Sequence, residues 1–509
     1  MTPSNSIIAK NTLLLYMRML FVMGVTLYTS RIVLAQLGIN DYGVYNIIGG
    51  VIAIFGGISA AMATTTQRYI TFELGKTNNS DVNAVFNASI RVHSLIALII
   101  VALSETIGLW FLYNKLDISG TSSTTAFWVF QFSIATTATI IVSVPYNAII
   151  IAYEKMSAFA YISLIEVVLK LGIAFSLALY PQNKLILYSA LIFIAQLLIR
   201  TIYTIYCRHN FKETKIRHIR KKSLIKEMFG FAGWNLWGNF ASVILGQGLN
   251  LILNIFFGPI VNAARGVAFQ VQGAVLQFST NFQMAINPQI TKKYSSGEIQ
   301  EMQLLLCRSS RFSFILLFAI SFPLMMIINE ILQLWLEQVP PYTSQFIMLI
   351  LCISLLSSMA QPIMQGAQAS GNIKKYQVII SSILLLSLPL GYCVARKGLA
   401  PISVFIVQFI VEIVAFVVRL LIVKPLIDLN INHFFKDVIV RCITILLISA
   451  PIPFLIRSIL FPLSFLDILL VITISFICAS LSAFCFGLTK NERIFVFSKV
   501  KSIICHKKL

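Results

Sequence analysis

Charged residues are scarce in this sequence, and acidic residues are the scarcest. Only 11% of the 509 residues are charged, and Asp and Glu together number 18 against 39 Lys and Arg. An ordinary soluble domain carries about a quarter charged residues. Hydrophobic residues make up 58% of the chain, and a water-soluble fold could not hide that much apolar surface. A soluble protein is therefore excluded.

Motifs for nucleotide hydrolysis and for common catalytic centres are also absent. The chain contains no G-x-x-x-x-G-K-[ST] loop, no nucleophile elbow and no His-Glu-x-x-His motif. Its polar segments are too short to hold an ATPase domain or a carboxylate site for glycosyl transfer. We therefore predict that the protein is not an enzyme, that it needs no cofactor and that ATP does not drive it directly.

Metal and nucleic-acid sites are not indicated either. The eight cysteines are scattered, without a Cys-x-x-Cys pair or histidines at metal-ligand spacing. The formal net charge of +21 would suit nucleic acid only if the basic residues gathered on a soluble face. They lie instead in short loops between apolar runs, so we predict no metal and no nucleic-acid partner.

Long apolar runs fill most of the chain. Runs of 18 or more residues recur along it, and each is long enough to cross about 30 Å of hydrocarbon as a helix. Barrel strands would show ten-residue alternation instead. We predict an all-α integral membrane protein with about fourteen transmembrane helices, the first of them a retained span. The distribution of Lys and Arg predicts that both termini are cytoplasmic.

An internal repeat relates the two halves of the sequence. Leu37-Gly38 is echoed by Phe257-Gly258, and Pro145 by Pro362, at offsets of about 220 residues. We predict two pseudo-symmetric six-helix lobes that can rock against each other, as alternating access requires. The predicted domains are an N-terminal six-helix lobe at 1–207, a basic cytoplasmic linker at 208–226, a C-terminal six-helix lobe at 227–424, and two additional transmembrane helices with a basic cytoplasmic tail at 425–509.

Ionisable residues inside the spans are the functional candidates. Each costs about 2.5 to 3.5 kcal/mol at the bilayer centre and should face the bundle interior. Arginine suits a pyrophosphate because its planar donors grip phosphate oxygens in pairs. We therefore predict a cationic, substrate-binding cavity between the halves, to which four arginines contribute: Arg18, Arg31, Arg91 and Arg265.

Other polar residues in the spans have competing interpretations. Glu105 and Glu412 are candidates for coupling to a proton or sodium gradient. Amides in the seventh and eighth spans either bond neighbouring helices or contact sugars, and the candidates for sugar contact are Gln247, Asn250 and Gln270. Glu166 and Lys170, spaced i, i+4, are predicted to form a structural pair. Three arginines nearer the cytoplasmic helix ends are predicted to reach the headgroups: Arg200, Arg308 and Arg419.

Four stretches carry a family resemblance. They are SRIVLAQLGINDYGVYNIIGG at 30–50, ATTTQRYITFELGK at 63–76, VPYNAIIIAYEKMSAFAY at 144–161 and LNIFFGPIVNAARGVAFQVQGAV at 253–275. The sequence resembles bacterial polysaccharide transporters, the oligosaccharidyl-lipid flippase branch of the multidrug and polysaccharide exporter superfamily. The resemblance implies a V-shaped fourteen-helix bundle in the bacterial inner membrane. It also implies flipping of an undecaprenyl-pyrophosphate-linked oligosaccharide repeat unit for O-antigen or capsule, with membrane lipids, a glycan polymerase and other assembly enzymes as partners.

Two rival functions remain open. A multidrug or organic cation antiporter of the same superfamily should expose carboxylates in its cavity, whereas this chain has an excess of arginine in its spans. A membrane glycan polymerase or ligase should have a large periplasmic loop. The longest predicted outer loops, near 114–123 and 330–341, are short.

Overall fold

The computed structural model describes an all-helical chain. It covers residues 3–53, 56–76, 81–114, 122–180, 183–216, 222–336, 339–460 and 464–494. Every regular element in these ranges is a helix, which confirms the predicted fold class. Eleven helices in the described part are long and apolar enough to cross a membrane, and a shorter apolar helix covers Asn11–Thr26. The chain is a multi-pass membrane protein, and about fourteen spans are consistent with these helices.

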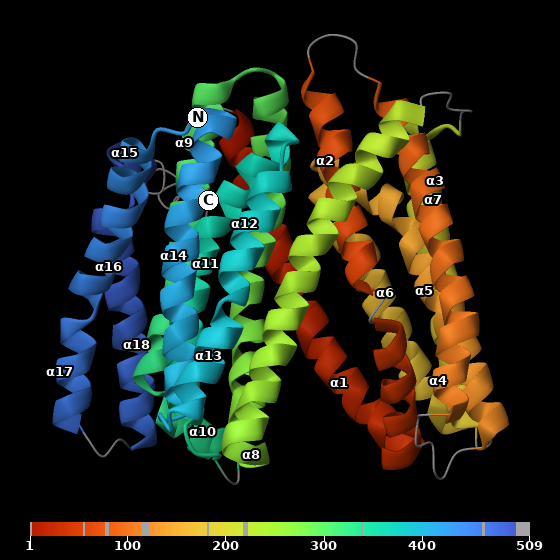
Figure 1. Ribbon diagram of the computed structural model, residues 1–509, viewed down its shortest axis with the longest axis horizontal. Coiled ribbons are helices and arrows are strands. Elements are labelled where there is room, and N and C mark those ends of the chain that lie inside the picture. Colours follow the sequence, from red (N-terminus) through yellow and green to blue (C-terminus); the bar gives the residue numbers. More distant parts are fainter. Residues whose placement is uncertain are drawn as a thin grey trace, which may run out of the picture. The chain divides into compact units, whose positions relative to one another are not determined.

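Unit 1 is the first of two compact units and contains residues 1–240 and 284–298 (Figure 1). Its helices are α1 (Pro3–Ala53), α2 (Gly56–Gly75), α3 (Val82–Leu103), η1 (Ser104–Gly108), α4 (Leu109–Asn114), α5 (Ser123–Ala152), α6 (Met156–Ser176), η2 (Leu177–Leu179), α7 (Lys184–Asn210) and η3 (Lys212–Thr214). The two ends of the long helix α8 (Lys222–Ser295) also belong to it.

Unit 2 contains residues 241–283, which form the middle of α8, and residues 299–509. Its other helices are α9 (Ile299–Met326), α10 (Ile328–Trp335), α11 (Thr343–Ser370), α12 (Lys374–Leu385), α13 (Ser387–Arg396), α14 (Ile402–Ile427), α15 (Ile431–Phe434), η4 (Phe435–Val440), α16 (Arg441–Ser449), α17 (Pro451–Leu460), α18 (Phe465–Ser482) and η5 (Ala483–Gly487). Here α16 and α17 pack on α18, and α18 packs on α9. The lobe boundaries drawn from the sequence stay a prediction.

The core of unit 1 is built around α5, which packs against α2, α3 and α7. Buried Ile70, Phe86 and Tyr146 come from three of these helices and belong to one apolar cluster. The Phe86 and Tyr146 rings meet edge to face with centroids 5.4 Å apart. Lipid is as apolar as these side chains, so close van der Waals packing holds the helices together.

Two glycines break long helices at equivalent positions of the repeat. Gly38 interrupts α1 with φ 76° and ψ 169°, and Gly258 interrupts α8 with φ 79° and ψ −179°. Only glycine adopts this combination readily, because a Cβ atom would clash with the backbone. The shared conformation supports the duplication that the sequence echo indicates.

A second pair of equivalent turns differs in residue type. Glu154, just after α5, has φ 59°, and Gly371, just after α11, has φ 81°. Glu154 is therefore held in a conformation that costs a non-glycine residue about 1 kcal/mol or more. Its carboxylate accepts hydrogen bonds from Gln289 Nε2 at 2.9 Å and from Lys292 Nζ at 2.7 Å. These contacts offset the backbone strain.

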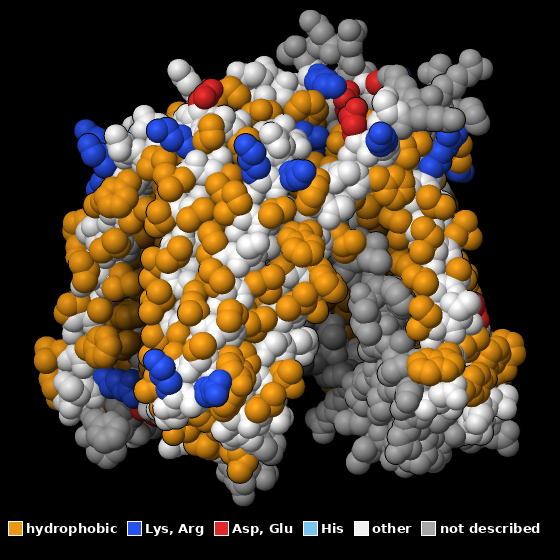
Figure 2. Space-filling model, viewed as in Figure 1, with side chains coloured by type: hydrophobic (Ala, Val, Ile, Leu, Met, Phe, Trp, Pro, Cys, Tyr) orange, Lys and Arg blue, Asp and Glu red, His pale blue; other side chains and the backbone are white. Residues whose placement is uncertain are grey.

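The outer surface is suited to lipid. On the visible face of unit 2, hydrophobic side chains cover the middle of the helices, and Lys and Arg lie near the helix ends (Figure 2). Many large apolar side chains are exposed, among them Leu98, Ile107 and Leu447. Exposure on this scale would be unfavourable in water and is expected in a bilayer.

Candidate functional site

Arg18 is held at the contact between α1 and α6, two helices that pack along each other in unit 1. Its Nε donates a hydrogen bond to Ser163 Oγ. The guanidinium also lies over the Phe159 ring, 4.7 Å from its centroid, an arrangement that favours a cation. Both partners are uncharged, so the positive charge of Arg18 is oriented without being neutralised by either of them.

Glu166 and Lys170 lie one turn apart on α6. Lys170 Nζ is 2.6 Å from Glu166 Oε1, and the side chains are 42% and 27% exposed for Lys170 and Glu166. The pair predicted from the i, i+4 spacing is therefore present. Glu166 is also near enough to Arg18 to interact with it electrostatically. One carboxylate thus interacts with two cations.

A cavity of about 300 Å³ opens beside these three charges. Its polar lining consists of Arg18, Thr26, Thr29, Tyr45, Ser163, Glu166, Lys170 and Tyr188, and its apolar lining consists of Val22, Val33 and Val167. The Tyr45 and Tyr188 rings meet edge to face with centroids 5.0 Å apart. Thr29 Oγ1 is buried and has no hydrogen-bond partner among the described residues. The cavity therefore offers an excess cation and an aromatic wall.

The local sequence explains why these residues meet. The α1 positions Arg18, Val22, Thr26, Thr29 and Val33 are spaced by three or four residues, so they form one stripe along the helix. The lining residues of α6 occupy positions i, i+3, i+4 and i+7 and therefore share one face of the helix: Ser163, Glu166, Val167 and Lys170. Two such stripes face each other because α1 packs on α6.

Of the three predicted substrate-binding arginines whose side chains the structure describes, only Arg18 lines this cavity. Arg91 is exposed on α3 of unit 1, and the side chain of Arg31 lies outside the described residues. Arg265 belongs to unit 2, where its Nη2 donates to Gly246 O at 2.6 Å and its guanidinium lies 4.2 Å from the Phe269 ring centroid. Convergence of the four on one cavity between the halves stays a prediction.

The two carboxylates proposed for ion coupling have different environments. Glu105 lies in η1, a π-helical turn of the third span, and accepts a hydrogen bond from Gln131 Nε2 at 3.1 Å. Glu412 is buried and forms an ion pair with Arg419, whose Nη1 is 2.6 Å from Glu412 Oε1. Arg419 was expected to reach the headgroups, but only 10% of its side chain is exposed because it neutralises Glu412. Among the described residues, no cation forms an ion pair with Glu105.

Several amide side chains of α8 form hydrogen bonds to neighbouring helices. Gln272 Nε2 donates to Ser354 Oγ at 2.8 Å, and Gln283 Nε2 donates to Ser313 Oγ at 3.2 Å. Both bonds join α8 to another helix of unit 2. The three amides proposed to contact sugars are in the same unit: Gln247 and Gln270 are exposed, and Asn250 is half-buried.

The sequence interpretation missed the functional potential of Glu166, Lys170 and Ser163. Glu166 and Lys170 were treated as a structural pair because they satisfy each other on one helix. The signal that could have revealed the cavity is the matching stripe on α1, which places polar Thr26 and Thr29 in line with Arg18 within an apolar span.

Comparison with known proteins identifies the fold. No protein-family profile and no curated protein sequence matches this chain. A multidrug resistance MATE family transporter of the MOP superfamily, solved in an outward-facing conformation, matches with a TM-score of 0.69 and 14% identity over 84% of this chain and 98% of that one. The Vibrio cholerae MATE transporter VcmN in its bent form matches with a TM-score of 0.63, 16% identity and coverage of 84% and 98%.

A third solved structure has a different binding pocket. It is a MOP superfamily transporter from Pyrococcus furiosus, with a TM-score of 0.65, 13% identity and coverage of 84% of this chain and 98% of that one. It is described as having a pocket of reverse polarity that suggests a different function. At these identities the comparisons show that this chain has the fold of MATE transporters.

Proposed function

We propose that this protein is a secondary transporter that moves a small or amphipathic solute across a membrane by alternating access. The fold supports this, since the solved proteins that share it are named as transporters. The observation that carries the proposal is the cavity of unit 1, where Arg18, Glu166 and Lys170 of two apolar helices are gathered. Ionisable groups within spans are functional candidates for binding or coupling.

The comparisons favour a multidrug antiporter, which would carry an organic cation. The first solved structure above is named as a multidrug resistance transporter, and the sequence had suggested such an antiporter as the alternative to a flippase. A cavity of about 300 Å³ with two tyrosines suits a small aromatic solute. Glu166 would meet an organic cation there.

A lipid-linked oligosaccharide flippase is the second candidate, and the charge of the cavity favours it. Two cations and one carboxylate leave one net positive charge, which suits a phosphate better than an organic cation. The Pyrococcus furiosus transporter indicates that this fold accommodates pockets of reverse polarity. The substrate would be an undecaprenyl-pyrophosphate-linked repeat unit in the bacterial inner membrane, with a glycan polymerase and other assembly enzymes as partners and both chain termini cytoplasmic. A polymerase or ligase activity has no support from this transporter fold.

Reconstitution in proteoliposomes tests transport and separates the two substrates. One assay follows uptake of a fluorescent organic cation under an imposed proton or sodium gradient, and the other follows flipping of a short polyprenyl-pyrophosphate saccharide. Glu166→Gln removes the carboxylate and leaves both cations. It should abolish transport of a cation, whereas it should preserve or increase flipping of a pyrophosphate. Transport of neither probe by the wild-type protein would contradict the proposal.

A further inference from the structure

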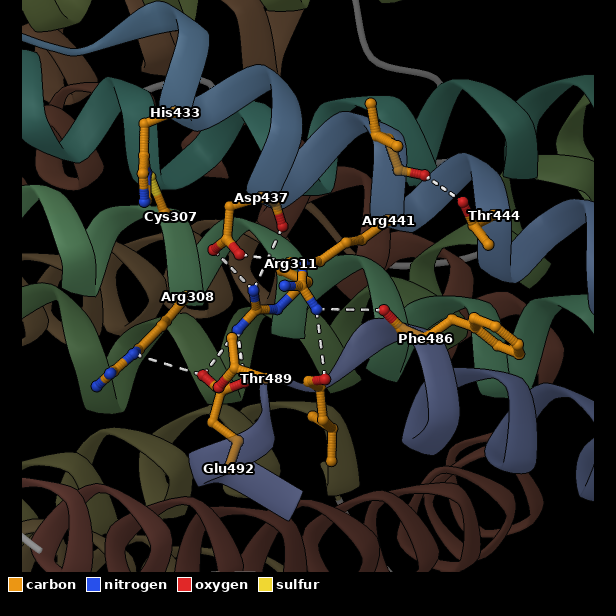
Figure 3. A network of polar contacts seen from close by, with 12 residues as sticks. Cys307, Arg308, Arg311, His433, Asp437, Arg441, Thr444, Phe486, Thr489 and Glu492 are labelled. Atoms are coloured by element: carbon orange, nitrogen blue, oxygen red, sulfur yellow. Dashed lines mark hydrogen bonds and ion pairs between the residues drawn. The ribbon is translucent and has the colours of Figure 1, made fainter. Parts of the chain in front are cut away.

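A buried arginine joins the last two spans to α9 in unit 2 (Figure 3). Arg311 of α9 is 0% exposed. Its Nη1 lies 2.7 Å from Asp437 Oδ2 in η4, and its Nη2 lies 2.7 Å from both oxygens of Glu492, which follows η5. Residues that are far apart in the sequence therefore meet in one ionic cluster.

Two further arginines surround this cluster and carry its exposed charge. Arg308 Nε is 3.4 Å from Glu492 Oε1, and Arg441 Nε is 3.0 Å from Asp437 Oδ1. The side chains of Arg308 and Arg441 are 41% and 31% exposed, against 17% for Asp437 and 14% for Glu492. With three guanidiniums and two carboxylates, the cluster has a net charge of one positive. Its accessible part is cationic.

Figure 3 shows the terminal nitrogens of Arg308 pointing away from the cluster. Arg441 is anchored from the other side, because its Nη1 donates to the carbonyl oxygens of Phe486 and Leu488 at 3.4 and 3.3 Å. The π-helical turns η4 and η5 supply Asp437 and Phe486 respectively. Such turns leave backbone carbonyls unpaired and are frequent at functional sites.

Apolar side chains are exposed on the same two π-helical turns. Phe435 of η4 is 52% exposed and Phe486 of η5 is 45% exposed. The span of α9 begins at Ile299, and the last span ends at Gly487. Glu492 lies beyond the end of the last span, and Asp437 lies in the first turns of Ile431–Leu460, so the cluster is nearer to one end of these two spans. The positive-inside rule predicts that this end is cytoplasmic.

We propose that Arg308 binds the headgroup phosphate of an anionic phospholipid whose acyl chains lie on the exposed apolar side chains of these spans. Guanidinium groups bind phosphate oxygens in pairs and stay charged when partly desolvated. The buried Arg311 takes up much of the charge of both carboxylates, which leaves the outward-pointing terminal nitrogens of Arg308 able to attract an anion. Leu304, one turn earlier on α9, is 46% exposed, and such apolar neighbours favour a lipid over free phosphate.

The test measures lipid binding to the purified full-length protein by native mass spectrometry, with phosphatidylglycerol compared with phosphatidylcholine. Arg308→Ala should weaken phosphatidylglycerol binding about fivefold, the worth of one basic residue near a membrane surface, and Arg308→Lys should restore part of it. The matched control is Arg396→Ala at the end of α13, which the predicted topology places on the opposite face. It should bind as the wild type does.

Three results would overturn the proposal. They are equal binding of both lipids by the wild type, unchanged phosphatidylglycerol binding by a folded Arg308→Ala variant, and complete displacement of the lipid by millimolar inorganic phosphate. Thermal unfolding of each variant shows whether it is folded, and Arg308→Gln replaces any variant that is not. The binding measurement needs no transport, so it does not depend on the proposed function.

Discussion

Arginine has different roles in the two units. In unit 2, Arg311 is neutralised within an ionic cluster, whereas in unit 1, Arg18 lies beside a cavity. Both terminal nitrogens of Arg311 bond carboxylates, and its side chain is 0% exposed. Arg18 bonds a serine hydroxyl and an aromatic ring beside a cavity of about 300 Å³. A buried guanidinium whose terminal nitrogens both bond carboxylates stabilises the fold, whereas one held by a hydroxyl and an aromatic ring next to open space remains available to a ligand.

Removing the buried Arg311 should have the largest effect on stability. Arg311→Ala leaves Asp437 and Glu492 without their buried partner, and breaking a buried ion pair costs about 3 to 5 kcal/mol. We expect a clear fall in the thermal unfolding midpoint of the detergent-purified protein. The control Arg308→Ala, at a partly exposed position of the same helix, should lower the midpoint far less. Equal unfolding midpoints for the two variants would show that the buried Arg311 contributes no more to stability than the partly exposed Arg308.

Removing the available arginine should instead affect transport. A hydrogen bond to a charged group contributes about 1.5 to 3 kcal/mol, so Arg18→Ala should lower transport of an anionic solute about 10- to 100-fold in proteoliposomes. Its unfolding midpoint should stay close to that of the wild type, because Ser163 and Phe159 are uncharged partners. Arg18→Lys should retain part of the activity. A large loss of stability with normal transport would mean that Arg18 stabilises the fold and does not bind the solute.

The equivalent turns after α5 and α11 also differ in whether ionic side-chain contacts are present. Glu154 has such contacts, and Gly371 has no side chain. Gly371→Ala forces a Cβ atom into a left-handed conformation and should cost about 1 kcal/mol. Glu154→Gly relieves that strain in the other turn but removes the contacts with Gln289 and Lys292, so the two effects should nearly cancel. Thermal unfolding of both variants checks this. A large destabilisation by Glu154→Gly would mean that its side-chain contacts outweigh the strain.

The smallest effect is expected at Thr29. Its buried hydroxyl has no partner in the described part of the chain, and an unsatisfied buried polar group is unfavourable. Thr29→Val, which keeps the shape, should raise the unfolding midpoint slightly and leave transport unchanged, because the buried hydroxyl does not face a solute. The control Thr201→Val removes an exposed hydroxyl that already bonds Leu197 O at 2.8 Å, so its unfolding midpoint should not rise. A loss of transport in Thr29→Val would mean that the hydroxyl contacts the solute.

Part of the site was accessible from the sequence. The i, i+4 spacing predicted the contact between Glu166 and Lys170 because both lie on one helix, and the composition identified Arg18 as a costly charge within a span. The partners of Arg18 and Arg311 were not accessible. Ser163 is on α6, and Glu492 lies beyond the last span, so both contacts depend on which helices pack together.

Hydrophobicity and local backbone chemistry determined the class of this protein and the breaks in its helices. Long apolar runs can satisfy their backbone groups in lipid only as helices, and Gly38 and Gly258 mark the two repeats because only glycine takes that conformation readily. Tertiary packing decided which charges became neutralised. An ion pair or a cavity is a relation between helices distant in the chain, and its energy depends on distances and burial that no single helix contains.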